Sequence, residues 1–490
     1  MRFAHSSSVD DSDAALQASQ NTSGFARRWS EAKVETLIFG GLLMGLAWTP
    51  FWLGGNRTPA WGIDGVYFPS LVFLYEAHLL LTGASHPVGV KRLAIPAALF
   101  ALVVIWIFVQ LSTLVPAALA HPIWAMAADA LGQPIAGAIS VNRGATHLAL
   151  LRLLTAASVF WLSLQLCRHE TRAQALLRFL SFVVAAYAAY GLILAALFSS
   201  AIPFFDAPDA GGFVRSTFVN RNNFATYAGL GLIVSVALTL ELYRPEVSTA
   251  LGMEANRLGR FIEATGRRSA ATLGASFVTL VALLASGSRG AAMAISLALL
   301  VLFALAFSRQ RSRAEAIEAI VFVAAALFAS FAFFGEVFLG RVAASGLEDA
   351  KRLSVYRITL NSILDTPLFG YGFGTFADVF PMYRDQSISR LGVWEKAHDD
   401  YLEIFQGLGL VFGSALLAAL SLIALKSFSG AIRRRRETTS GAVAAAASLL
   451  VGVHALVDFS MQIEAVALTY MAILGLGAAQ AESSRRRVSD

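Results

Sequence analysis

Residues 95–115 read IPAALFALVVIWIFVQLSTLV, a stretch that contains no charged side chain. A helix of about 20 apolar residues crosses the hydrocarbon core of a bilayer, and in lipid the backbone must satisfy its own hydrogen bonds, which favours a helix. Residues 34–54, VETLIFGGLLMGLAWTPFWLG, repeat the pattern. Over all 490 residues, 57% are hydrophobic and 14% are charged. A soluble domain carries about 25% charged residues, so the sequence predicts a membrane protein.

The apolar segments predict an all-α fold, a polytopic membrane helical bundle of about twelve transmembrane helices with one long, partly helical loop. The expected spans are residues 34–53, 65–83, 93–118, 146–166, 174–198, 223–243, 270–286, 290–307, 317–336, 401–425, 441–458 and 463–480. The chain then divides into a disordered N-terminal tail (1–33), spans one to nine (34–336), the loop (337–400), spans ten to twelve (401–480) and a C-terminal tail (481–490).

The placement of Lys and Arg predicts the topology. With the N-terminus in the cytoplasm, 25 of the 38 basic residues fall in cytoplasmic segments, as the positive-inside rule requires. Both termini are therefore expected in the cytoplasm, and the long loop on the outer side. Because the formal charge of +6 is spread between the spans, it signals topology, and no nucleic-acid partner is expected.

The arginines that break this rule indicate an anion site on the outer side. Arg215 and Arg221 lie in a short outer segment, and Arg289 lies in the tight GSRGA turn. Asn220, Asn222 and Asn223 open the sixth span, where a helix N-terminus favours an anion, and guanidinium forks suit phosphate. For Arg289 the alternative is a snorkelling side chain. Together with Arg352 of the long loop, these arginines predict a pyrophosphate clamp.

The long loop contains a predicted helix and a glycine motif. In residues 349–367, Leu353, Tyr356, Leu360 and Ile363 or Leu364 form the expected apolar stripe, and Pro367 ends the helix. Arg352 and Arg357 lie off this stripe, about 140° apart around the axis, so both do not face one small target, and Arg352 is favoured. Gly370, Gly372 and Gly374 follow, and are expected to form a tight turn at the membrane surface.

His398 stands where the chain re-enters the membrane, in the segment AHDDYLEIFQGLGL (397–410). Imidazole takes up a proton near neutral pH and can act as a general base. Asp399, Asp400 and Tyr401 follow it as candidate supporting groups. On residue types alone, an interfacial polar cap of the tenth span remains the alternative. Asp458 and Glu464, which flank the last outer turn, are expected to be solvated.

Other features limit the chemistry. Cys167 is a single cysteine, and no Cys/His cluster has metal-ligand spacing, so neither a metal nor another cofactor is expected. The sequence contains no phosphate-binding GxxxxGK[ST] loop. The donor is therefore expected to arrive already activated, as a lipid pyrophosphate would, with a leaving group that arginines stabilise.

Four motifs, in this order, resemble the O-antigen ligase and O-antigen polymerase superfamily. They are FVNRNNFATYAG (218–229), SGSRGA (286–291), RLSVYRITLNSILDTPLFGYGFGTF (352–376) and AHDDYLEIFQGLGL (397–410). The family pattern has Asn, Ser or Gln after the histidine, whereas Asp399 stands there in this chain. The resemblance implies a fold like that of the C-type glycosyltransferases in a bacterial inner membrane.

The resemblance also implies an activity. Enzymes of this superfamily take a glycan from undecaprenyl pyrophosphate in the periplasm and transfer it to lipid A–core (ligase) or to a growing polysaccharide (polymerase). His398 would deprotonate the acceptor hydroxyl, with inversion and without a metal, and Arg215, Arg221, Arg289, Arg352 and Arg357 would hold the pyrophosphate. Ligase and polymerase both stay open. A flippase or transporter is the alternative class, but such proteins carry intramembrane charges in matching halves, which this sequence lacks.

Overall fold

The structure is a computed structural model, and it describes residues 33–198, 202, 211–250, 267–307, 346–389, 392–434 and 438–481. In these ranges every regular element is a helix, so the all-α prediction is confirmed. The longer ones are α2 (Thr58–Thr82), α3 (Ala94–Leu111), α5 (Arg143–Leu166), α6 (Glu170–Leu197), α7 (Arg221–Ala250), α9 (Arg267–Ala285), α10 (Arg289–Phe307), α13 (Gly346–Asp365), α15 (Asp400–Arg433), α16 (Thr439–His454) and α17 (Glu464–Ala481). The shorter ones are α4 (Ile123–Leu131), α14 (Phe376–Tyr383), η1 (Thr49–Phe51), η2 (Val90–Leu93) and η3 (Ser460–Gln462).

Nine helices in the described ranges are long and apolar enough to cross a bilayer, the first of them Lys33–Phe51. They correspond to the expected spans one to six, eight, ten and twelve. The expected seventh and eleventh spans are shorter apolar helices, Ala270–Ala285 and Thr439–His454. The expected ninth span, 317–336, lies outside the described residues. The protein is therefore an integral membrane protein, while the total of twelve spans and their orientation remain predictions.

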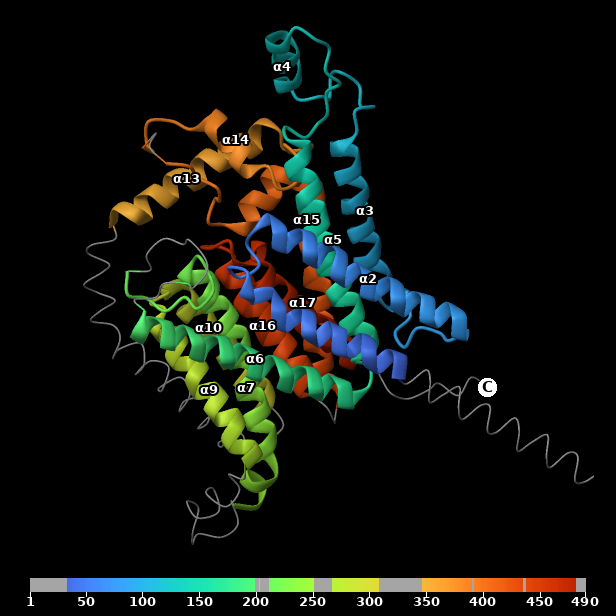
Figure 1. Cartoon of the computed structure of the whole chain (residues 1–490), viewed down its shortest axis with the longest axis vertical. Coiled ribbons are helices and arrows are strands. Elements are labelled where there is room, and N and C mark those ends of the chain that lie inside the picture. The colour runs from blue at the N-terminus through green and yellow to red at the C-terminus, as the bar shows by residue number, and fades with distance from the viewer. Residues whose placement is uncertain are drawn as a thin grey trace, which may run out of the picture.

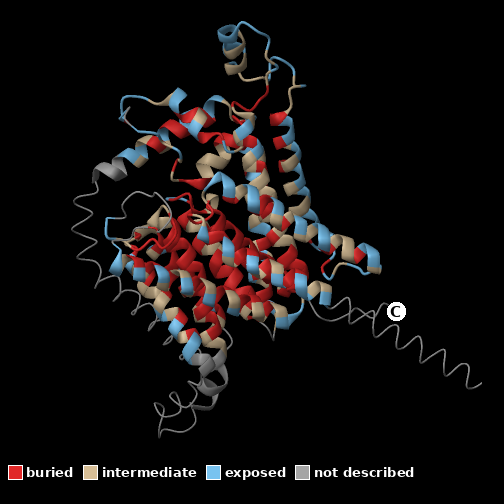
Figure 2. Cartoon of the chain, viewed as in Figure 1, coloured by how far each residue is buried: buried red, intermediate tan, exposed pale blue. Residues whose placement is uncertain are grey.

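Helices α7 and α17 form the centre of the bundle. In each candidate span we compared how much of its 18-residue apolar stretch is buried inside the structure. This share is 83% in α7 and 89% in α17, and at most 39% in the other candidate spans. Figure 2 shows this burial as the red centre around α16 and α17. Gly475 and Gly477 let neighbouring helices approach: a β-carbon would lie 2.5 Å from the Phe160 carbonyl oxygen and 2.3 Å from the Ala444 side chain. Small residues serve this purpose in membrane helix packing.

Helices α4, α13 and α14 lie beyond one end of the bundle (Figure 1). Helix α13 ends at Asp365, before Pro367, as predicted. Of its expected apolar stripe, Leu353, Leu360 and Leu364 are exposed, and Ile363 is buried. The buried face consists of Val355, Ile358, Thr359, Ser362 and Ile363. Thr359 and Ser362 fit there because each hydroxyl donates to a carbonyl of its own helix. With apolar residues on two sides of the helix, periodicity alone did not identify the buried one.

The glycine motif docks onto a break in α15. Gly409 has φ 78° and ψ 168°, which interrupts the helix. The N–H groups of Tyr371 and Gly372 donate to the carbonyls of Gln406 and Gly407, at 3.0 and 3.1 Å. The contact is so close that a β-carbon at Gly370 would lie 2.5 Å from the Gly407 carbonyl oxygen. The glycines therefore form the predicted turn, and in addition they attach the segment after α13 to α15.

Candidate active site

His398 lies just before α15 and adopts a left-handed backbone, with φ 60°. Such conformations are uncommon outside glycine and often mark functional positions. The Tyr356 hydroxyl of α13 donates to the His398 carbonyl at 2.9 Å. The imidazole packs edge-on against Trp394 and Phe459, with ring centroids 6.0 and 5.0 Å away. The ring orientation is thus fixed by the loop, by α13 and by the turn before α17.

The surroundings of His398 favour a neutral imidazole. Burial lowers the pKa of His398, and the positive charge of Arg352 lowers this pKa further, while Asp458 acts in the opposite direction. Its Nδ1 is buried and makes no hydrogen bond within the described residues. A neutral ring next to a carboxylate that would stabilise its protonated form has the properties of a general base.

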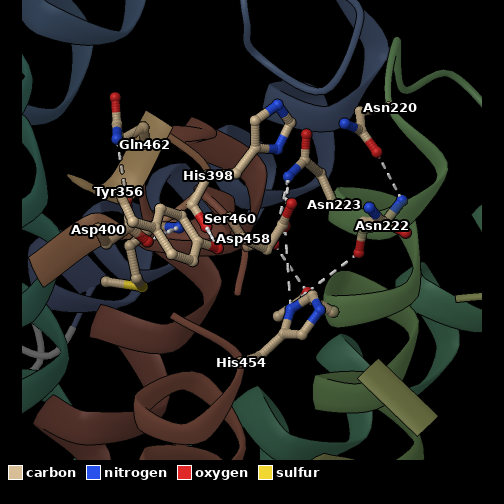
Figure 3. Close-up of polar contacts among 12 residues, drawn as sticks. Asn220, Asn222, Asn223, Tyr356, His398, Asp400, His454, Asp458, Ser460 and Gln462 are labelled. Atoms are coloured by element: carbon tan, nitrogen blue, oxygen red, sulfur yellow. Dashed lines mark hydrogen bonds and ion pairs between the residues drawn. The ribbon is translucent and has the colours of Figure 1, made fainter. Parts of the chain in front are cut away.

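Asp458 is fully buried, so the expectation that it is solvated is wrong. Its Oδ2 accepts hydrogen bonds from Asn223 Nδ2 at 2.8 Å and from the Ser460 hydroxyl. Its Oδ1 has no hydrogen-bond partner among the described residues. Figure 3 shows Asp458 and the Asn223 amide together with His398. The HALVD segment (454–458) gave one signal for this site, because His454 and Asp458 are four residues apart.

Asp399, Asp400 and Tyr401 hold the start of α15 in place. The Asp399 carboxylate caps the helix by accepting from the Leu402 N–H at 3.0 Å. Asp400 accepts from the Met461 N–H at 3.1 Å and from Gln462 Nε2 at 2.9 Å. The Tyr401 hydroxyl donates to the Gly452 carbonyl. These bonds fix the turn between α16 and α17, which carries Asp458, against the segment that carries His398.

At the start of α7, Asn220 caps the helix and Asn223 contacts the site. The Asn220 side chain accepts from the Asn222 N–H at 2.7 Å and caps the helix. Asn222 contributes its carbonyl to the Thr226 hydroxyl. Of the three asparagines expected there, Asn223 is the one whose side chain contacts Asp458 (Figure 3).

Arg215, Arg221 and Arg289 lie around the same end of the bundle. Arg215 is buried and donates to the Val219 carbonyl at 3.4 Å. The Arg221 guanidinium stacks on Phe213, 3.8 Å from the ring centroid. A β-carbon at Gly287 would lie 3.3 Å from Arg221 Nη1, so Arg221 packs against the short turn that precedes Arg289.

Arg352 and Arg357 differ in their contacts. Arg357 is exposed and pairs with Asp385 at 2.7 Å. Arg352 makes no ion pair within the described residues, and its charge acts on both His398 and His454. Arg352 and Tyr356 are one helical turn apart, so the same face of α13 holds the His398 carbonyl and presents the guanidinium. The charge of Arg352 thus acts on His398, and its contact with a donor stays a prediction.

A second group of polar and charged side chains, which we call the carboxylate cluster, was not predicted as a site, except for Asp400 as a candidate supporting group. Glu464 is buried, contrary to expectation, and lies 3.9 Å from Arg152 of α5. Glu403 accepts from the Ala397 N–H at 2.6 Å. Gln462 links the cluster, because its carbonyl accepts from Arg152 and its side chain from Lys396. The members are Asp64, Arg152, Lys396, Asp400, Glu403, Gln462 and Glu464.

No group of three or more His, Cys, Asp and Glu side chains among the described residues could hold a metal ion. The acids of the carboxylate cluster instead face Arg152 and Lys396. Independence from metals remains a prediction.

The comparisons with known proteins agree with the motifs. Residues 274–417 match the family model described as O-antigen ligase. The matched segment includes Arg289, Arg352 and His398, while Arg215 and Asp458 lie outside it. No curated protein matches the chain. The resemblance to the O-antigen ligase superfamily that the four ordered motifs carry is confirmed: residues 274–417 of this integral membrane protein form an O-antigen ligase domain.

Proposed function

We propose that this protein is a glycosyltransferase that moves a glycan from undecaprenyl pyrophosphate to an acceptor hydroxyl on the periplasmic side of a bacterial inner membrane. The observation that carries the proposal is the convergence of His398, Asp458 and Arg352 at one end of the bundle. The family match supports a lipid-linked glycan as the donor class.

The proposed reaction is a direct displacement. The neutral His398 imidazole takes the proton of the acceptor hydroxyl, and the oxygen attacks the anomeric carbon. The bond from that carbon to the pyrophosphate oxygen breaks, and undecaprenyl pyrophosphate leaves with the electron pair. One displacement inverts the anomeric centre. Asp458 stabilises the imidazolium that forms, and no metal takes part.

The arginines would stabilise the leaving group. The positive charge of Arg352 lowers the pKa of the proposed base, His398. Further guanidinium groups at the same end of the bundle come from Arg215, Arg221 and Arg289. Their forked donors suit the oxygens of a pyrophosphate. In this proposal Arg357 is bound to Asp385 and serves the loop instead.

The acceptor decides between two activities with the same chemistry. Transfer to lipid A–core would make the protein a ligase, and transfer to a growing chain a polymerase. Deleting the gene and separating surface lipopolysaccharide and exopolysaccharide on gels distinguishes them. Loss of all capped glycan indicates a ligase, and capping with single repeats indicates a polymerase. Unchanged profiles of both glycans would contradict the proposal.

A further inference from the structure

His454 is a second buried histidine near Asp458, and the proposed reaction does not use it. It is in the last turn of α16 and is 2% exposed. Its Nδ1 lies 2.7 Å from the Thr226 hydroxyl and 3.9 Å from Asp458 Oδ2. Asp458 therefore faces two imidazoles, that of His398 and that of His454 (Figure 3).

Counting hydrogens places a proton on His454 Nδ1. The Thr226 hydroxyl donates to the Asn222 carbonyl, which accepts at 3.1 Å. It also lies 2.9 Å from the Ser460 hydroxyl, which itself donates to Asp458. A hydroxyl has one hydrogen to donate. The bond between Thr226 and His454 is therefore donated by the histidine, and it fixes the ring.

The charges around His454 act in opposite directions. Asp458 favours a protonated ring, and Arg352 of α13 opposes it. Helix α10 presents its N-terminus, beside Arg289, because a β-carbon at Gly290 would lie 3.3 Å from His454 Nε2. A helix N-terminus carries partial positive charge and also opposes a second proton. The α7 group in contact with His454, the Thr226 hydroxyl, is uncharged.

We propose that His454 is a positioning residue that shares the Asp458 carboxylate with His398, so that transfer requires both imidazoles to be uncharged and stops when His454 takes up a proton. The inference rests on the proposed function, in which Asp458 stabilises the imidazolium of His398. One carboxylate compensates one imidazolium. A proton already on His454 would occupy Asp458 and repel the proton that His398 must accept.

The test is the pH dependence of glycan transfer by the full-length protein in nanodiscs, with a lipid-pyrophosphate glycan donor. If protonation of either of two groups stops the reaction, the wild-type rate should fall by about 100-fold per pH unit at the acid extreme, which is a slope of two in a plot of log rate against pH. If only one group matters, the fall is about 10-fold and the slope is one. His454→Asn keeps a donor for Thr226 but does not titrate. It should change the slope from two to one. His147→Asn is the matched control, because His147 is exposed and bonds to a carbonyl of its own helix. It should keep the slope of two.

A second measurement does not need activity. Hydrogen–deuterium exchange at the histidine C2 position, followed by mass spectrometry, reports the titration midpoint of each ring. The two rings share one coupling free energy, and the ring that takes up its proton second, at the lower pH, shows most of it. At least one midpoint should therefore rise, that of His398 in His454→Asn or that of His454 in His398→Asn, because a competing positive charge is gone. This second variant also serves if His454→Asn does not insert.

The outcomes separate the two proposals. Three results would overturn the sharing of Asp458 and leave the transfer reaction intact. They are a slope of one in the pH–rate profile of the wild type, a slope of two in that of His454→Asn, and histidine titration midpoints that do not move in either variant. A wild-type protein that transfers no glycan would overturn the proposed function. In that case the exchange midpoints alone decide whether the two histidines share the carboxylate.

Discussion

The arginine cluster (Arg215, Arg221, Arg289 and Arg352) and the carboxylate cluster both lie near the His398 segment, but they are built differently. In the carboxylate cluster, Arg152 and Lys396 face buried acids of the protein. In the arginine cluster, the contacts include a backbone carbonyl for Arg215 and an aromatic ring for Arg221.

This difference indicates what each cluster does. A buried cation that pairs with the protein's own carboxylates holds helices together, and breaking the pair leaves an uncompensated charge. The arginine cluster is the proposed donor site, and forked guanidinium donors suit the oxygens of an anionic ligand. Mutations in the first cluster should therefore reduce the amount of folded protein, and mutations in the second the activity per molecule.

The largest expected effect on activity comes from His398→Asn. Loss of a general base typically reduces the rate by about 10²–10⁴-fold, and asparagine accepts the left-handed backbone better than most residues do. Glycan transfer per milligram of purified protein measures the effect, with His147→Asn as the control. If most of the specific activity remained, His398 would have only a structural role beside the start of α15.

The next effect concerns stability. Glu464→Ala leaves Arg152 buried without its nearest carboxylate, which typically costs about 3–5 kcal/mol. The double variant Glu464→Ala/Arg152→Met should recover much of this loss, because no charge is then left unpaired. Thermal unfolding in detergent measures both. An unchanged unfolding temperature with a large loss of specific activity would place the carboxylate cluster in the catalytic site instead.

Two arginines of one helix give an internal comparison. Arg352→Gln should remove a charge-assisted contact to the donor, which is worth about 1.5–3 kcal/mol, or roughly 10- to 150-fold in transfer. Arg352→Lys should rescue only part of it, because lysine lacks the fork. Arg357→Gln breaks an exposed ion pair worth about 0–1 kcal/mol and should stay within a few-fold of wild type. Equal losses in both variants would contradict the assignment.

The smallest expected effect is a shift in pH dependence. Because burial and Arg352 lower the pKa of His398, the activity should persist below the ordinary histidine pKa of about 6.5. Arg352→Gln removes a positive charge, so it should move the acid limb to higher pH. The folded state binds this proton less tightly than the unfolded state, so His398 also destabilises the fold as pH falls below about 6.5. If the acid limb of the pH–activity profile moved to lower pH in Arg352→Gln, this electrostatic account would be refuted.

The sequence predicted the features that depend on local patterns. Apolar length predicted the helices and the four motifs predicted the family, while the roles of His398 and Arg352 stay predictions. It did not predict the burial of Asp458 and Glu464. A carboxylate in an outer turn is normally solvated, and these two are buried because Asn223 and Arg152 reach them from helices far away in the sequence. The HALVD spacing alone did not reveal these partners.

The break at Gly409 has a consequence for how the protein is made. The carbonyls of Gln406 and Gly407 accept from the segment after α13, and Gln110 of α3 donates to Gly407 as well. Without these partners, unpaired carbonyls would have to be desolvated inside the membrane. In the proposed topology, in which the long loop is periplasmic, α15 therefore cannot reach its final position until that loop has crossed the membrane and folded back. Shortening that loop should delay membrane integration of α15 before it affects any chemistry.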